Sequence, residues 1–118
     1  MEVERQVVAW VRELFRFPPT ASGLFVTGTS MANLIAVLVA RAGALGIGAR
    51  RQGIAAGGRR LIAYTSAAAH SCIAQAMDLS GLGSDALAII PVNQRFEIDI
   101  QALEAAIARD KQIGRAHV

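Results

Sequence analysis

The first part of the chain has hydrophobic residues on one face of a helix. Val3, Val7 and Leu14 recur at helical spacing, while charged residues occupy the opposite face. This pattern predicts an amphipathic helix over about residues 3–15. Pro18 and Pro19 follow it, and we expect them to end the helix because proline lacks a backbone donor and disfavours helix in the preceding residue.

Three short apolar runs come next, and each is followed by a segment with helical periodicity. The runs have the length and composition of buried strands, and they are residues 24–26, 61–65 and 87–90. The predicted helices cover residues 30–44, a segment that ends near residue 79, and a segment that begins near residue 99. Apolar strands that alternate with helices are typical of a parallel sheet between helical layers, so the predicted fold class is α/β. We expect the glycine-rich residues 46–60 to form a flexible surface connection.

The turn between the first run and its helix is a candidate anion site. Thr27-Gly28-Thr29-Ser30 leads directly into the helix. The first N–H groups of a helix have no partner within it, and the helix dipole adds positive charge there. The hydroxyls of Thr29 and Ser30 can donate further hydrogen bonds to a phosphate. Either hydroxyl would serve equally well as an ordinary N-cap of the helix.

A second candidate follows the next predicted strand, at His70. Ligands of parallel α/β sheets bind beyond the carboxyl ends of the strands, so residues 27–30 and 66–70 are expected on one side, within reach of a single ligand. The neighbours of His70 are small, which leaves its imidazole free to lie flat against a planar ligand. An ordinary capping or hydrogen-bonding role is the alternative.

Several kinds of site are excluded by the sequence pattern. One cysteine and no second histidine at ligand spacing argue against a metal site. The glycine-containing turn at Gly28 matches neither the Walker phosphate loop nor the dinucleotide-binding Gly-x-Gly-x-x-Gly pattern. No Ser-His-acid triad can be argued, because Ser71 is merely adjacent to His70 in sequence.

Composition narrows the class of protein further. The chain has 118 residues, of which 53% are hydrophobic and 18% charged, so it can bury a core and forms at most one domain. The longest apolar run, Leu34–Ala40, is too short for a membrane span of about 20 residues. Acidic residues near the N-terminus argue against a signal peptide. The single Cys72 excludes an internal disulfide and makes the cytoplasm the expected location.

A basic cluster raises the question of nucleic-acid binding. The net charge is +3, and five arginines fall in a segment rich in glycine and alanine, at positions 41, 50, 51, 59 and 60. The segment has no aromatic residues to stack on bases. A solvated loop is therefore favoured over a nucleic-acid interface, which stays open as a non-catalytic alternative.

Two sequence blocks together resemble a known enzyme family. Gly23-Leu-Phe-Val-Thr-Gly-Thr-Ser-Met-Ala-Asn-Leu is similar to the phosphate turn of the group II pyridoxal-phosphate-dependent amino acid decarboxylases. Tyr64-Thr-Ser-Ala-Ala-Ala-His-Ser is similar to the same family's strand that leads to its ring-stacking histidine. The first helix and Gly81-Leu-Gly83 also fit, so the resemblance runs from Met1 to about Gln112. Met31 departs from the acidic residue common in animal members, a change that we interpret as tolerated.

The resemblance implies a fold, a cofactor and site residues. The fold would be part of the mainly parallel-sheet large domain of a fold type I pyridoxal-phosphate enzyme. Thr29 and Ser30 would hold the phosphate of pyridoxal 5'-phosphate, and His70 would stack on its ring as a catalytic residue. The family's cofactor-linking lysine and the aspartate that pairs with the pyridine nitrogen would lie beyond residue 118. Lys111 is the only lysine of the chain, and its place at the end of a polar helix does not suit that role.

The resemblance also implies an activity: a homodimeric cytoplasmic decarboxylase of L-amino acids. An aromatic substrate is the preferred prediction, and diaminobutyrate, glutamate or aspartate are alternatives. An aminotransferase or a carbon–sulfur lyase of the same fold type is the nearest other reading. For a decarboxylase or another enzyme of this fold type, the expected partners are a small amino acid and a second subunit, with no nucleic acid and no membrane.

A separate hypothesis concerns the origin of the last six residues. Ile113-Gly-Arg-Ala-His-Val118 is the peptide that a widely used sequencing adapter would encode. We therefore expect residues 1–112 to be a partial cofactor-binding domain and residues 113–118 to be a non-native tail. Genomic reads test this, because native coding sequence through codon 113 would refute it.

Overall fold

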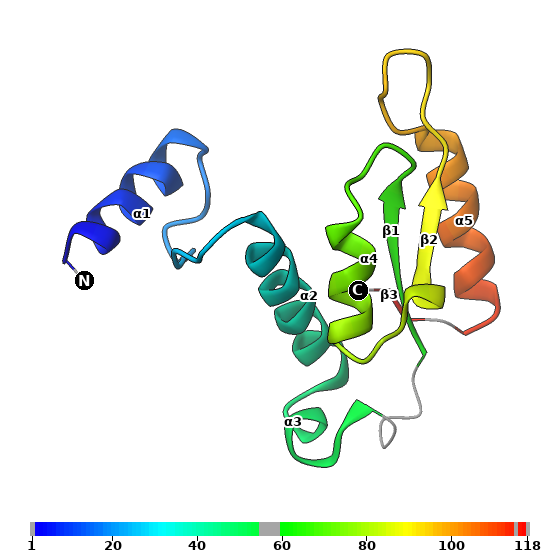
Figure 1. Cartoon of the computed structure of the whole chain (residues 1–118), viewed down its shortest axis with the longest axis horizontal. Coiled ribbons are helices and arrows are strands. Elements are labelled where there is room, and N and C mark those ends of the chain that lie inside the picture. The colour runs from blue at the N-terminus through cyan, green and yellow to red at the C-terminus, as the bar shows by residue number, and fades with distance from the viewer. Residues whose placement is uncertain (1, 55–59, 115, 118) are drawn as a thin grey trace.

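The computed structural model describes residues 2–54, 60–114 and 116–117. Its first element is helix α1, Glu2–Leu14, which confirms the predicted amphipathic helix. Arg12 Nη1 donates to the Pro19 carbonyl at 2.9 Å, so the chain turns back along the helix after its end. Helix α1 buries none of its described side chains, and it lies apart from the sheet with its following segment (Figure 1).

The sheet confirms two of the three predicted strands. Strand β1, Leu61–Ser66, pairs in parallel with β2, Leu87–Ile90, from Ala63↔Leu87 to Ser66↔Ile90. On its other edge β1 pairs in parallel with a short strand β3, Ala116–His117, so the strand order is β2-β1-β3. The parallel α/β arrangement predicted from the sequence is therefore present. Strand β3 falls within residues 113–118, the segment predicted to be a non-native tail.

The prediction of a strand at residues 24–26 is wrong. Leu24 and Phe25 are 64% and 57% exposed, and the described part of the chain holds no strand beside them. A strand is defined by its hydrogen-bonded partner as well as by its composition. The apolar run is thus present without the pairing that would make it a strand.

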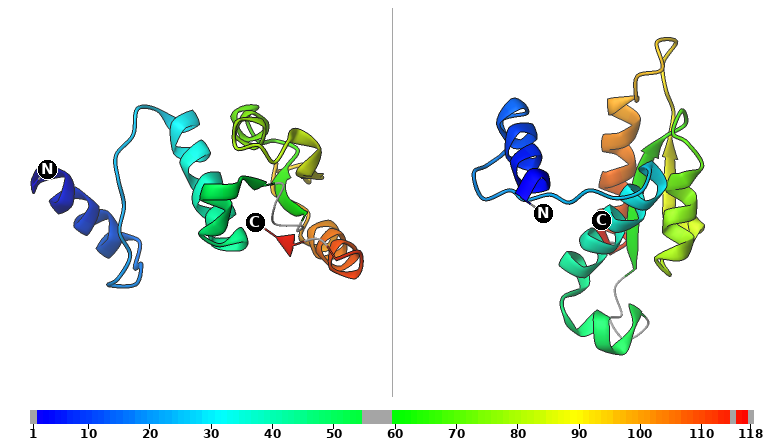
Figure 2. Two further views of the ribbon diagram at one scale, coloured as in Figure 1. Left: turned by 90° about the horizontal axis from the view of Figure 1, so that it is seen from below. Right: turned by 60° about the vertical axis from the view of Figure 1, so that its left-hand side comes forward.

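Helices cover both faces of the sheet. Helix α2, Thr29–Leu45, and helix α4, Cys72–Leu79, pack together on one side, and α5, Ile100–Gln112, lies on the other (Figure 2). All three confirm the predicted helices to within a few residues. Asp99 is the N-cap of helix α5, because its carboxylate accepts a hydrogen bond from the Ala102 N–H at 3.0 Å.

The segment predicted as a loop, residues 46–60, contains a short helix. Helix α3, Gly48–Gln52, lies between Gly46 and Gly53, whose φ angles are +77°. Alanine, arginine and glutamine favour helix, and the two glycines adopt the left-handed region that bounds it. Residues 55–59 of this predicted connection, Arg59 among them, lie outside the described residues.

The core lies where α4 and the strands meet. Its buried apolar side chains are Leu61, Ile62, Cys72, Ala76, Met77, Ile90 and Ala106. A short 3₁₀ helix, η2, Ser84–Ala86, leads from α4 into β2. Helix α5 is tied to the sheet by a polar contact, in which the Tyr64 hydroxyl donates to Asp110 Oδ2 at 2.9 Å. Within the described residues, no helix is long and apolar enough to cross a membrane.

Candidate functional site

The N-terminus of α2 presents backbone and hydroxyl donors to solvent. The helix is preceded by Gly28 at φ +83° and ψ 159°, and no side chain in the described part of the chain caps it. Its backbone hydrogen bonding starts at the Ala32 N–H, which donates to the Gly28 carbonyl. The N–H groups ahead of Ala32 have no acceptor within the helix. Thr29 and Ser30 are exposed, so this turn has the donor set that a phosphate requires.

Glycine at position 28 is needed for this geometry. A φ of +83° with an extended ψ is a conformation that side chains with a Cβ rarely adopt. Apart from the adjoining residues of the chain, no atom of the described residues lies within 4 Å of an ideal Cβ at this position. The backbone here is therefore bare and open on one side, which lets a ligand approach the first turn of α2 closely.

His70 lies at the start of α4, just beyond the end of β1. Its Nδ1 accepts a hydrogen bond from the Cys72 N–H at 3.1 Å, and the ring is otherwise exposed. Because Nδ1 is the acceptor, the geometry assigns the proton of the neutral imidazole to Nε2. The capping role foreseen as an alternative is thus present, and it leaves the faces of the ring and the Nε2–H group to a ligand.

The structure brings the two predicted site turns to one end of a helix pair. Asn33 Nδ2 donates to Cys72 Sγ at 3.2 Å, which joins the N-terminal ends of α2 and α4. Arg41 Nη1 donates to the Ser80 carbonyl at the other end of α4. The helices therefore run parallel, as Figure 1 shows, and their N-termini point to the same edge of the sheet. Two positive helix ends at one edge reinforce its attraction for an anion.

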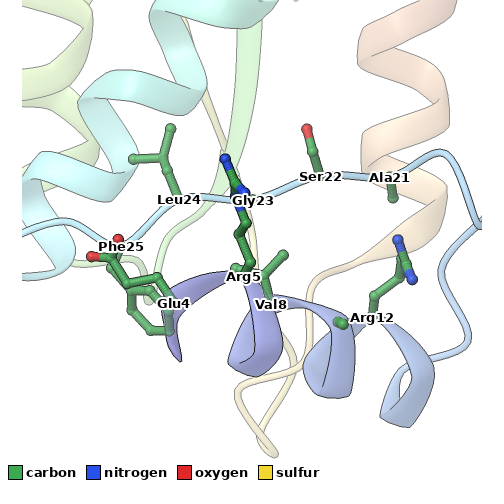
Figure 3. A pocket seen from close by; sticks show the side chains of 10 residues that line it. Glu4, Arg5, Val8, Arg12, Ala21, Ser22, Gly23, Leu24 and Phe25 are labelled. Atoms are coloured by element: carbon green, nitrogen blue, oxygen red, sulfur yellow. The ribbon is translucent and has the colours of Figure 1, made fainter. Parts of the chain in front are cut away.

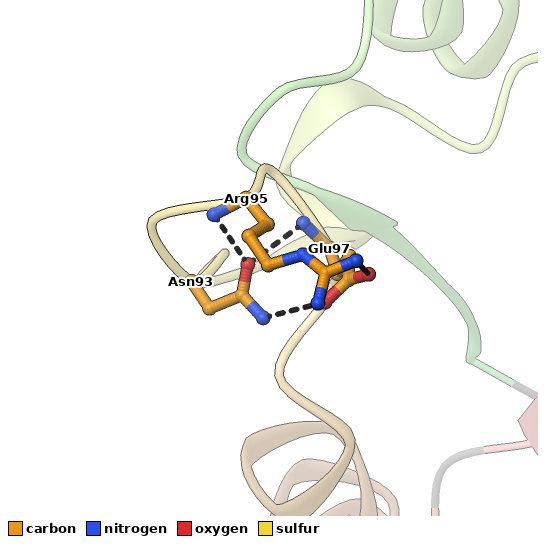
Figure 4. A network of polar contacts seen from close by, with 3 residues as sticks. All are labelled: Asn93, Arg95 and Glu97. Atoms are coloured by element: carbon orange, nitrogen blue, oxygen red, sulfur yellow. Dashed lines mark hydrogen bonds and ion pairs between the residues drawn. The ribbon is translucent and has the colours of Figure 1, made fainter.

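The connection from β2 to α5 lies beyond the same carboxyl edge of the strands. Asn93 Oδ1 accepts from the N–H groups of Arg95 and Glu97, at 2.8 and 3.1 Å. The Asn93 amide donates to Glu97 Oε2, and Arg95 pairs with the same carboxylate (Figure 4). This network holds Phe96 at φ +61° with its side chain 78% exposed. The turn is well ordered by its own contacts, and it includes none of the predicted site residues.

A cavity lies elsewhere, between α1 and the extended segment 21–25. It has a volume of about 500 Å³ and is lined by Arg5, Val8, Leu24 and Phe25 among others (Figure 3). Its guanidinium groups and apolar walls could accept many ligands. It contains none of Thr29, Ser30 and His70, so we do not place the candidate site there.

Sequence reasoning missed Asn33 as a residue of this region and treated Cys72 only as an indicator of the redox environment. A signal for Asn33 was available, because it is a polar residue within an otherwise apolar helical segment. Its partner lies 39 positions away, and no sequence pattern identifies that pairing. The described residues contain no group of three His, Cys, Asp or Glu side chains that could hold a metal ion. Lys111, on the last turn of α5, is exposed.

This architecture is a parallel α/β arrangement in which the uncapped first turn of α2 lies at the carboxyl edge of the strands. A family model described as the pyridoxal-dependent decarboxylase conserved domain matches residues 1–118. The chain belongs to the pyridoxal-dependent decarboxylase family.

Individual relatives agree with this assignment. The aromatic-L-amino-acid decarboxylase of Bacillus atrophaeus is 28% identical over 114 residues, which cover 97% of this chain and 22% of that protein. An L-2,4-diaminobutyrate decarboxylase of Rhizobium meliloti (strain 1021) is 31% identical over 116 residues, covering 98% and 22%. The chain therefore spans about a fifth of the length of the curated relatives that it matches.

A solved structure shows the same fold. The crystal structure of mouse CSAD has a TM-score of 0.87 to this chain at 24% identity, over 97% of this chain and 23% of that one. This likeness confirms the α/β fold class expected from the sequence, and the family model carries the assignment to the pyridoxal-dependent decarboxylases.

Proposed function

We propose that this chain provides the phosphate and ring contacts for pyridoxal 5'-phosphate. The observation that carries the proposal is the meeting of two features at one end of the α2–α4 pair, the uncapped first turn of α2 and the exposed ring of His70. Thr29 and Ser30 would donate hydrogen bonds to the phosphate, together with the first N–H groups of α2. The dianion would lie against the positive end of the helix dipole.

His70 would lie against the pyridine ring. Its Nδ1 is engaged by the Cys72 N–H at 3.1 Å, which restrains the imidazole relative to the backbone of α4. A restrained ring loses less freedom when it stacks on a planar cofactor. Phosphate contact and ring contact from two adjacent helices would then fix both the position and the tilt of the cofactor.

For the protein that contains this chain, we propose decarboxylation of an L-amino acid. When bound, pyridoxal phosphate supplies an electron sink for the pair left behind as the carboxylate departs as CO₂. The residues of this chain bind and orient the cofactor. An aromatic substrate is our specific proposal, supported by the relative from Bacillus atrophaeus. We further propose a cytoplasmic homodimer, as the family resemblance implies.

An assay of the full-length protein tests this function. We expect an absorbance band from bound pyridoxal phosphate, and CO₂ release from an L-amino acid panel that includes tryptophan, tyrosine, phenylalanine, 2,4-diaminobutyrate, glutamate and aspartate. Aromatic amino acids should react fastest. A bound cofactor with transamination or carbon–sulfur cleavage, and no CO₂, would contradict decarboxylation. Preference for diaminobutyrate would contradict only the aromatic specificity.

Replacing Ser30 with glutamate tests the phosphate contact. The change places a carboxylate against the cofactor dianion and removes a hydroxyl donor, so we expect the Kd for pyridoxal phosphate to rise by at least about tenfold. Equilibrium dialysis or the cofactor absorbance measures it. Gln6→Glu adds the same charge on the exposed face of α1 and should leave the Kd unchanged. Equal affinity in Ser30→Glu and the wild type would place the phosphate elsewhere.

A further inference from the structure

Asn33 and Cys72 join the two helix ends that carry the proposed cofactor contacts. Asn33 lies one turn beyond Thr29 in α2, and Cys72 is the first residue of α4 and only 5% exposed. The amide nitrogen Nδ2 of Asn33 donates to Cys72 Sγ at 3.2 Å. This distance is short for a hydrogen bond to sulfur, so the two helix ends are held in close contact.

The same cysteine also holds the proposed ring contact. Its backbone N–H donates to His70 Nδ1 at 3.1 Å. Cys72 therefore links the two residues, since its side chain accepts from Asn33 of α2 and its backbone N–H donates to the His70 imidazole. If the first turn of α4 shifted relative to α2, the imidazole would shift with it, because its restraint is attached to that turn.

The contact acts on one end of a helix pair that is also fixed at its other end. A second hydrogen bond joins the two helices, between Arg41 of α2 and the Ser80 carbonyl at the end of α4. Arg41 lies eight residues after Asn33, and Ser80 lies eight residues after Cys72. Eight residues of helix span about 12 Å. Loss of the Asn33–Cys72 hydrogen bond would therefore free the N-terminal ends of α2 and α4 to move apart. The Arg41–Ser80 hydrogen bond would still join the opposite ends of the two helices.

We infer that Asn33 is a positioning residue for His70 and acts through Cys72. The amide sets where α4 begins relative to the first turn of α2, and so it sets the imidazole relative to the phosphate turn. The inference rests on the proposed function for its effect on the cofactor. Its effect on the imidazole itself does not depend on any ligand.

The test compares three variants of the full-length protein with the wild type. Asn33→Ala removes the donor. Cys72→Ser keeps an acceptor at the same place and retains the backbone N–H that binds His70. Tyr64→Phe is the matched control, because it removes the hydroxyl that donates to Asp110 on the opposite face of the sheet. The readouts are the side-chain ¹⁵N signals of His70 without cofactor, assigned with His70→Ala, and the Kd for pyridoxal phosphate.

The expected results separate positioning from general destabilisation. In the wild type and in Tyr64→Phe, the His70 signals should show Nδ1 fixed as the acceptor. In Asn33→Ala they should move toward the averaged values of a free imidazole, and the Kd should rise about threefold to tenfold, as expected for one lost hydrogen bond. Cys72→Ser should retain most of the wild-type affinity, and Tyr64→Phe should leave it unchanged within about twofold.

Two results would overturn the inference. One is an unchanged His70 signal in Asn33→Ala. The other is an unchanged Kd in that variant when the wild type binds the cofactor. A wild type that binds no pyridoxal phosphate would contradict the proposed function instead, and the ¹⁵N comparison would then decide the positioning role alone.

Discussion

His70→Ala in the full-length enzyme is expected to lower kcat on the order of a hundredfold, the loss typical of a misplaced reacting group. The thermal midpoint should fall by only a few degrees. The side chain is exposed, and the hydrogen bond described for it is the one from the Cys72 N–H. Losing a helix-capping contact of that kind costs about 1 kcal/mol. Steady-state decarboxylation and a melting curve of the same preparation measure both effects.

Two further substitutions separate the imidazole's two roles. His70→Asn retains a side-chain acceptor for the Cys72 N–H but has no aromatic face, so we expect it to be stable and nearly as inactive as alanine. His70→Phe retains a flat ring without the acceptor, and it should bind the cofactor better than the asparagine variant. Near-normal turnover in His70→Asn would show that the histidine serves the helix end and not the cofactor.

Residues 1–118 expressed alone are expected to be insoluble or to lack a cooperative melting transition. Their accessible surface is 8727 Å², whereas a folded protein of this mass has about 6,100 Å². The radius of gyration is 16.2 Å, against about 13.5 Å for a compact chain of this length. The fold therefore leaves much of its apolar surface in water.

The exposed apolar side chains explain this expectation. Leu14, Leu24 and Phe25 are each more than half exposed in the N-terminal part, and Ile47 and Leu79 further along the chain are 80% and 73% exposed. Apolar surface on this scale promotes association, as does the unpaired apolar segment 24–26. We also expect weak binding of pyridoxal phosphate at best, and no decarboxylation.

Sedimentation, circular dichroism and a melting curve of the isolated chain test this prediction. A molten chain would keep its helical far-ultraviolet signal and lose its near-ultraviolet signal from fixed tertiary packing. Addition of pyridoxal phosphate is the control for stabilisation by ligand. A soluble monomer with a sharp melt would contradict the prediction and would show that the chain is a domain in its own right.

Local sequence signals determined the elements whose causes are local. The spacing of hydrophobic residues predicted α1, α2 and α5 to within a few residues, because an amphipathic repeat depends only on near neighbours. Strands β1 and β2 were predicted because their β-branched, apolar composition suits burial between helical layers. The rule that ligands bind at the carboxyl edge of parallel strands predicted residues 27–30 and 66–70 on one side of the sheet.

Helix α3 was missed although its causes are also local. Its five residues, Gly48–Gln52, are too few to show a hydrophobic period, and the glycines around them favoured a loop. The turn around Asn93 has an internal hydrogen-bond network and a left-handed Phe96, and no sequence pattern predicted either. Such details depend on which side-chain acceptor meets which backbone donor.

Only the tertiary structure decided the contacts between distant segments. Residues 24–26 have the composition of a strand, yet strand formation requires a hydrogen-bonded neighbour, and the sheet of the described residues is built on β1 instead. The Asn33–Cys72 and Tyr64–Asp110 hydrogen bonds join residues 39 and 46 positions apart. Composition and spacing carry no information on such pairs, because helix packing and strand register choose the partners.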